Sequence, residues 1–423
     1  MSRKPSLFVI FLTVFLDLVG FGIVLPLLPL YGEHYNAQGW QIGLLMASYS
    51  LMQFLFAPAW GRLSDRIGRR PVLLVSTAGA VASYALFAWA THFTGATALW
   101  LIITSRALAG ICGANITVAQ AYIADISPPE QRSKRMGLIG MAFGLGFIFG
   151  PPIGGVAFRH FGDPGPGIVA SALCALNFIL AFIILSESWK PNAHADAARR
   201  PRLEQWKHTL GQPTIGLLVV VFFLATFCFT CFEITLGLVI ANNFKLGFKT
   251  PEAISVAGTL FMYCGIIGAF VQGGPIGKLV KKLGEPKLIA ISLLLTGLSL
   301  APMPFIHGEG KLSWSLLFSN QGGPWWMLLL VLAVLSIGSG LTRPPLFGLL
   351  SILTPADQQG ATIGIAQSAG SLARIFGPMF AGSLFEAHAA IPYLTCAVIA
   401  VITGIVAWGK LSRLQSPATS PLA

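Results

Sequence analysis

Charged residues are scarce in this chain of 423 residues: Asp, Glu, Lys and Arg together make up 10% of it, and hydrophobic residues make up 55%. A soluble domain carries about 25% charged residues, so the composition excludes an ordinary soluble protein and indicates a chain built for lipid. Acids are the scarcest, with 15 Asp and Glu against 27 Lys and Arg. Most of the bases fall in one alternating set of loops and termini, as expected when basic loops stay cytoplasmic. The net charge therefore requires no nucleic-acid partner.

The patterns of a disulfide scaffold, a metal site and a catalytic site are also lacking. All six cysteines lie in apolar runs, which argues against an extracellular disulfide framework. None of the seven histidines is paired with an acid at metal-ligand spacing, and no nucleophile motif occurs. We therefore expect no metal, no cofactor and no enzymatic activity.

Long apolar runs are abundant instead. A membrane span needs about 20 apolar residues, and the first run continues to Tyr31 without a small-residue cleavage site, so it predicts a span and not a signal peptide. An even number of spans puts both termini on the Lys/Arg-rich cytoplasmic side, in a cell inner membrane. The expected class is an all-α integral membrane protein with twelve spans, at 7–31, 41–60, 72–91, 98–125, 136–158, 168–187, 214–241, 254–277, 287–307, 325–350, 361–385 and 390–409.

An internal repeat divides the spans into two sets of six. Residues 127–158 recur 227 positions later as residues 354–385, with shared identities that include Gly150/Gly377 and Pro151/Pro378. Internal repeats of this kind are typical of transporters. They predict two pseudo-symmetric six-helix bundles, 1–187 and 214–423, joined by the polar, basic linker 188–213.

Residues 61–70 form a polar segment between two apolar runs. Its four arginines cannot enter hydrocarbon cheaply, which predicts a tight loop at the membrane surface. The segment resembles the signature between helices 2 and 3 of the major facilitator superfamily, through Gly61, Asp65, Arg66, Gly68, Arg69 and Arg70. The resemblance implies that Asp65 latches the cytoplasmic mouth, with Asp125 and either Arg132 or Arg135 as expected partners. The alternative is a loop that its charge alone keeps in the cytoplasm.

The span at 136–158 carries a glycine series: Gly137, Gly146, Gly150, Pro151, Gly154 and Gly155. Glycines four residues apart let two helices approach closely, and a proline removes a backbone hydrogen bond and bends the helix. A generic packing face would explain the glycines alone. The full pattern is similar to the antiporter motif of drug:proton exchangers, which implies export.

Two acids lie inside predicted spans, Asp17 and Glu233, which are 216 residues apart. An intramembrane carboxylate is costly and indicates function by default, and burial disfavours its charged form, as a proton carrier requires. We expect both to couple transport to protons; the alternative is a structural acid that bonds neighbouring groups. After Asp17, Gly20-x5-Pro26-x2-Pro29 predicts a helix break and also resembles the twelve-helix drug:proton antiporters.

Three arginines also enter spans. Arg106 begins Arg-Ala-Leu-Ala-Gly, which is similar to the superfamily's span-4 motif that is linked to proton transfer. Arg343 lies nearer the cytoplasmic end of its span and could snorkel to the surface. Polar residues within spans could line a substrate cavity or simply join helices by hydrogen bonds. The candidates are Gln53, Asn115, Gln120, Tyr263, Gln367 and Arg374.

The resemblance is strongest over residues 8–158 and lies nearest the tetracycline/proton antiporter branch. That branch has an acid before a tyrosine in span 3 and another in span 9, both tied to the metal–tetracycline cation. Here span 3 reads Ala82-Ser83-Tyr84, and no acid lies between Leu288 and Phe305, which argues against tetracycline itself. We expect a monomeric, proton-coupled exporter of amphipathic small molecules, cationic or zwitterionic, in the lipid bilayer. The alternatives are a transporter of an endogenous lipid or metabolite, and a transport-dead membrane sensor or scaffold.

Overall fold

The computed structural model describes residues 5–113, 115–189, 202–246, 251–310, 312–319 and 322–411. These residues form helices and connecting turns, without a strand among them. Residues 190–201 of the predicted linker lie outside the described residues. The helices from the first half of the chain are α1 Leu7–Val24, α2 Leu28–His34, α3 Gly39–Ile67, α4 Arg69–Ala90, α5 Gly95–Cys112, α6 Asn115–Asp125, α7 Pro129–Phe161, α8 Gly165–Ile184 and α9 Arg202–Gly211.

The second half continues the same design. Short 3-10 turns occur at Leu25–Leu27, Met303–Phe305 and Ala356–Gln358. The remaining helices are α10 Pro213–Asn243, α11 Pro251–Gly273, α12 Ile276–Leu283, α13 Glu285–Leu300, α14 Trp314–Leu317, α15 Gly323–Leu353, α16 Gln359–Ala387 and α17 Ala390–Leu411.

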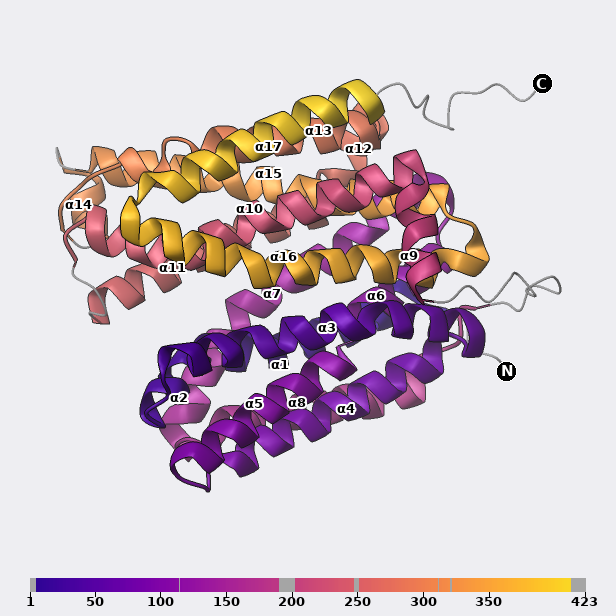
Figure 1. The fold of residues 1–423 in the computed structure, drawn as a ribbon, viewed down its shortest axis with the longest axis horizontal. Helices are drawn as coiled ribbons and strands as arrows, with labels where there is room; N and C mark the ends of the chain where they lie inside the picture. The colour runs from indigo at the N-terminus through magenta and orange to yellow at the C-terminus, as the bar shows by residue number, and fades with distance from the viewer. Residues whose placement is uncertain are drawn as a thin grey trace. The chain divides into compact units, whose positions relative to one another are not determined.

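The helices gather into two compact units. Unit 1 comprises Met1–Val219 and Phe347–Leu372, and unit 2 comprises Val220–Leu346 and Ala373–Ala423. Long helices run side by side within each unit (Figure 1). In unit 1, α1 packs along α7 and α8, and in unit 2, α13 packs along α17. Both α15 and α16 contribute residues to each unit, and the start of α16 belongs to unit 1.

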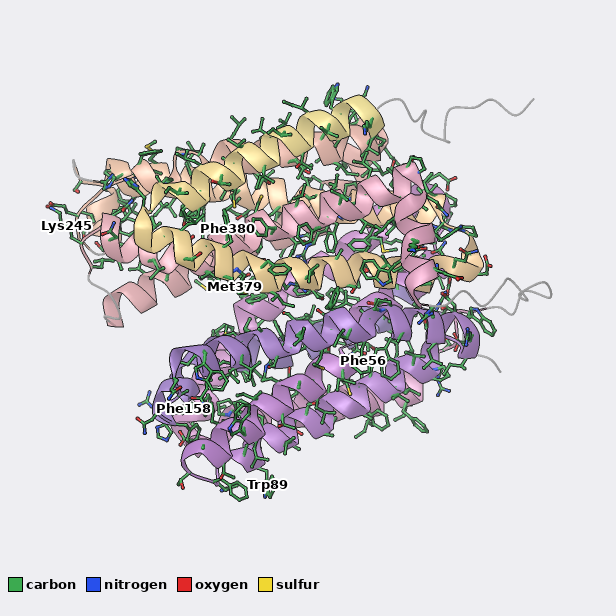
Figure 2. The ribbon with its side chains drawn as sticks, in the orientation of Figure 1. Phe56, Trp89, Phe158, Lys245, Met379 and Phe380 are labelled. Atoms are coloured by element: carbon green, nitrogen blue, oxygen red, sulfur yellow. The ribbon has the colours of Figure 1, made fainter. Side chains whose placement is uncertain are left out.

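The membrane spans follow the apolar runs. Among the described residues, eleven helices are long and apolar enough to cross a bilayer, and each matches a predicted run. The twelfth run, 361–385, forms α16, a helix of 29 residues that carries five Gly, three Ser and two Gln. Aromatic side chains mark helix ends: Trp89 projects from the end of α4 in Figure 2, and the Trp40 and Trp100 rings lie 6.2 Å apart. Exposed tryptophans of this kind are typical of membrane–water interfaces.

Three local predictions had different outcomes. The break in the first span is confirmed, because α1 gives way to a 3-10 turn at Leu25–Leu27. The tight loop at 61–70 was wrong: α3 continues to Ile67, and Gly68 alone, with a φ of 99°, separates it from α4. A helix end can extend past the hydrocarbon when its charged side chains find partners. The predicted span at 98–125 is present but consists of two helices, since α5 ends at Cys112 and α6 begins at Asn115.

Candidate functional site

Asp17 lies in the middle of α1 within unit 1. The side chain of Asn115 donates a hydrogen bond to its carboxylate. Asn115 is buried and is the first residue of α6, directly after the interruption between α5 and α6. Its other polar atom, Oδ1, is buried and has no hydrogen-bond partner among the described residues. The helix interruption therefore delivers an amide to the intramembrane acid.

The glycine series of α7 packs directly against α1 at this level. A Cβ atom on Gly150 would lie 2.5 Å from the Gly22 backbone, and one on Gly146 would lie 2.9 Å from the Leu18 backbone. Gly154 meets Ile23 in the same way, at 2.6 Å. Real Cβ atoms do not approach backbone so closely, so these glycines are what allows the two helices to touch.

The other members of the motif behave differently. Gly155 has nothing within 4 Å of the position that a Cβ would take, so packing does not require it. Gly137 is buried on the same helix, and α7 runs through Pro151 as one helix.

Arg106 is buried on α5. Its guanidinium lies 5.5 Å from the centre of the Phe21 ring and 5.0 Å from that of Tyr49, in the range of cation–π attraction. Its buried Nε and Nη1 atoms have no hydrogen-bond partner in the part of the chain that the structure describes. Tyr84 lies within electrostatic range of both Arg106 and Asp17. The acid and the base therefore share a neighbourhood, with no ion pair recorded between them among the described side chains.

A second group of charges lies in unit 2. Glu233 on α10, Arg343 on α15 and Arg374 on α16 act electrostatically on one another. The Arg343 guanidinium lies 5.7 Å from the centre of the Phe222 ring. The Arg343 charge therefore lies within electrostatic range of the other two intramembrane charges of the unit.

Asp65 forms a network where α3 approaches the start of α16, within unit 1. Its two carboxylate oxygens accept hydrogen bonds from the backbone N–H groups of Gly360 (3.0 Å) and Ala361 (2.8 Å). Arg69, whose side chain is fully buried, contacts Asp65 at 2.5 Å and Asp125 at 3.0 Å. Gly61 lies against the Gly360 backbone so closely that a Cβ on either residue would clash. Asp65 thus joins the end of α3 to the start of α16.

The two basic partners that the sequence suggested for Asp65 hydrogen-bond to backbone carbonyls instead. Arg132 donates to the carbonyl of Ser351 at 2.8 Å, and Arg135 donates to that of Ile126 at 2.8 Å. Arg69 takes their place because its position, four residues after Asp65 on the inner side of the turn, brings its guanidinium to both acids. Arg66 is exposed.

Glu187 is a further member of this network that the sequence analysis missed. It follows the end of α8 and accepts hydrogen bonds from the backbone N–H groups of Arg69 (2.9 Å) and Arg70 (3.0 Å), the first residues of α4. A Cβ on Gly68 would lie 2.5 Å from its Oε2 atom. The only available signal was an acid just after a span, in Ser186-Glu187-Ser188.

The predicted cavity amides meet one another in unit 1. Gln367 of α16 donates to Gln120 of α6 at 2.9 Å, and Ser371 donates to Gln53 of α3 at 2.8 Å. All of these side chains are buried. In unit 2, the Tyr263 hydroxyl donates to the Leu329 carbonyl at 3.2 Å and so ties α11 to α15. In this structure, the Gln53, Gln120 and Gln367 amides and the Tyr263 hydroxyl therefore connect neighbouring helices.

Known proteins resemble this chain along nearly its whole length. The family model described as Major Facilitator Superfamily matches residues 10–319 and 274–422. The class E tetracycline resistance protein of Escherichia coli is 33% identical over 385 residues, which cover 88% of this chain and 86% of the relative. The quinolone resistance protein NorA of Staphylococcus aureus is 28% identical over 407 residues, which cover 95% of each.

Solved structures agree with the sequence relatives. The human organic anion transporter MFSD10 superposes with a TM-score of 0.76 at 25% identity, over 96% of this chain and 100% of that one. The proton:xylose symporter XylE superposes with a TM-score of 0.70 at 18% identity over 96% of each chain, which shows the shared fold alone. The chain therefore belongs to the major facilitator superfamily of membrane transporters.

Proposed function

We propose that this chain is a proton-coupled exporter of amphipathic organic molecules that works by alternating access. The observation that carries the proposal is the position of Asp17 beside the contact of α1 with α7. Gly146 of the antiporter motif packs on the backbone of Leu18, the residue after Asp17. The intramembrane acid and the motif that is typical of exchangers therefore meet at one level of one helix pair.

Asn115 gives Asp17 a partner in both protonation states. A charged carboxylate accepts the Asn115 hydrogen bond that is present here. A protonated Asp17 gains an O–H donor, and the Asn115 Oδ1 atom is a buried acceptor without a partner in the described structure. Proton uptake would thus replace one hydrogen bond by another and remove a charge from the apolar interior, where charge is costly. Arg106 stays charged throughout and sets the local potential.

Glu233 is the corresponding candidate in unit 2. It lies on α10 near two guanidinium groups, so its charge state changes the charge of that whole cluster. Asp65 has a different role in the proposal. Its hydrogen bonds to Gly360 and Ala361 hold the start of α16 against α3, and we assign Asp65 as the latch that closes the cytoplasmic side in one transport state. The membrane of the proposal is a bacterial-type inner membrane.

The relatives support the cargo class. Those reported above are named for resistance to tetracycline and to quinolone, and the Bacillus subtilis protein with 28% identity over 406 residues (95% of this chain, 94% of the relative) is named multidrug resistance protein 2. The missing acids of spans 3 and 9 argue against tetracycline as the cargo here.

The test is transport by purified protein in liposomes. A pH gradient would be imposed, and the flux of ethidium, tetracycline and a fluorescent lysolipid would be compared with and without it. We expect gradient-driven movement of at least the amphipathic dye. Driven flux of the lysolipid alone would support the lipid transporter instead, and no driven flux of any of them would support a sensor or scaffold.

A further inference from the structure

The charge cluster of unit 2 does not balance. Arg343 and Arg374 contribute two positive charges, and Glu233 contributes one negative charge when it is ionised. Glu233 is the one acid on α10, α15 carries none, and the acid of α16, Glu386, lies in its last turn. The three helices that carry these charges therefore hold a net positive charge within hydrocarbon, where it is expensive and indicates function.

The helix packing places these charges around α10. The Cys231 thiol donates to the carbonyl of Gly377 at 3.4 Å, so α16 packs on α10 one turn from Arg374. Along the same helix, Arg343 of α15 stands over the buried Phe222 ring. All three charged side chains keep an intermediate exposure and are not sealed in the core. Figure 1 shows the three helices as long neighbours of unit 2.

The internal repeat does not require the second arginine. The position equivalent to Arg374 in the first half is Phe147, 227 residues earlier. Phe147 lies 6.4 Å from the Phe21 ring, in an aromatic contact. A structural role inherited by both halves would have kept an apolar side chain at this place. The second half instead has a guanidinium at this place, within electrostatic range of Arg343.

We propose that Arg343 and Arg374 bind an anionic group of the cargo, a carboxylate, sulfonate or phosphate, and that the nearby negative charge of Glu233 weakens this binding when Glu233 is ionised. The guanidinium is planar and always charged, and its donor fork matches these anions better than an ammonium does. This inference rests on the proposed function and narrows it: among amphipathic cargoes, those that carry an acid group are expected to bind most tightly at these two arginines.

The negative charge of Glu233 lies within electrostatic range of both guanidiniums and opposes a second anion there. Removing the charge of Glu233 should therefore strengthen anion binding, because it leaves two positive charges in place of one. A purely structural ion-pair network behaves differently, since loss of Glu233 would then lower stability and would not improve the binding of any ligand. This difference in sign separates the two roles.

The experiment measures equilibrium binding of dansylglycine, an amphipathic carboxylate, to the full-length protein purified in detergent. Dansylglycine methyl ester, which has the same ring without the charge, is the matched ligand control. We expect the acid to bind about tenfold or more tightly than the ester, and Arg374→Gln and Arg343→Gln to weaken acid binding by a similar factor. Glu233→Gln should strengthen it. Arg159→Gln, at the exposed end of α7, removes the same charge far from the cluster and should change nothing.

Further measurements exclude misfolding as the cause of weaker binding and identify the source of the anion. Arg374→Lys keeps the charge but loses the fork, so it should bind the acid with intermediate affinity, and the comparison of acid with ester needs no variant. Competition by octanoate indicates a soluble organic acid as the natural ligand, and competition by lysophosphatidate alone indicates a lipid phosphate; either would support the anion subsite.

Equal binding of acid and ester by the wild type would overturn the subsite, as would unchanged acid binding in both arginine variants. The proposed function fails by another result, the absence of gradient-driven flux of every cargo in liposomes, so the two failures are distinguishable.

Discussion

The Oδ2 atom of Asp65 accepts a hydrogen bond of 2.8 Å from the backbone N–H of Ala361, a residue 296 positions further along the chain. The N–H groups that begin a helix have no partner within it, and a carboxylate is favoured there by the helix dipole. Asp65 therefore satisfies the first turn of α16 while Arg69 and Asp125 fix its own position. A single side chain thus joins the end of α3 to the start of α16 within unit 1.

Asp65→Asn is expected to slow turnover with little change in substrate affinity. An amide offers one acceptor oxygen where the carboxylate offers two, so the latch on Gly360 and Ala361 weakens while the binding residues stay in place. Initial rates of ethidium flux in liposomes would be compared with binding constants in detergent. Asp163→Asn, at the other end of unit 1 where Asp163 pairs with His34, is the matched control. A large loss of affinity at unchanged turnover would refute the latch.

Gly150→Ala is expected to lower thermal stability and to abolish most transport. Its new methyl group would press on the Gly22 backbone from 2.5 Å, and overpacking of this kind costs about 1–3 kcal/mol. Gly155→Ala provides the control on the same helix, because nothing lies within 4 Å of its Cβ position, and alanine even favours the helix. Melting temperature and ethidium flux would be measured for both. Equal effects of the two substitutions would show that the contact of α1 with α7 has no special role.

The sequence predicted the helices because the length of an apolar run reflects bilayer thickness. It also predicted the break after α1 from Pro26, since a proline cannot continue the hydrogen-bond ladder. It missed the interruption at Gly113, because residues 98–125 are long and apolar enough to read as one span, and a glycine in such a run is as often a packing residue. Only the structure shows that this interruption brings Asn115 to Asp17.

Side-chain partners were harder to predict than helices. Asp17, Arg106 and Asn115 were identifiable because polar groups in hydrocarbon are rare. The partner of Asp65 was not, since the arginines of a polar segment look alike in sequence and only backbone geometry turns Arg69 inward. Glu187 was missed for the same reason: it acts on backbone N–H groups, which leave no trace in the sequence.

Glu187→Ala is expected to destabilise the start of α4. The carboxylate accepts the otherwise unpaired N–H groups of Arg69 and Arg70, and loss of a helix cap costs roughly 1 kcal/mol. A lower melting temperature would be the readout. Glu309→Ala is the control: Lys245 lowers the pKa of Glu309, but this pair is exposed to water, where an ion pair contributes little. A smaller loss of stability in Glu187→Ala than in Glu309→Ala would contradict the cap.

The topology is expected to place both termini in the cytoplasm. Single cysteines would be introduced at Glu204 on α9 and at Glu309, both exposed, in a chain cleared of its own cysteines. A membrane-impermeant maleimide applied to intact cells should label the cysteine at Glu309 and spare the one at Glu204 until the cells are opened. Labelling of both from the same side would refute the arrangement.

The most direct test of the proposed function is the response of Asp17→Asn to a proton gradient. Wild type, Asp17→Asn and the control Glu309→Gln would be reconstituted in liposomes, and ethidium flux would be measured with and without an imposed pH difference. The account predicts that the gradient accelerates the wild type and the control, whereas Asp17→Asn exchanges substrate at one rate in both conditions. Equal acceleration of Asp17→Asn and wild type would contradict it, because the proton would then be carried elsewhere.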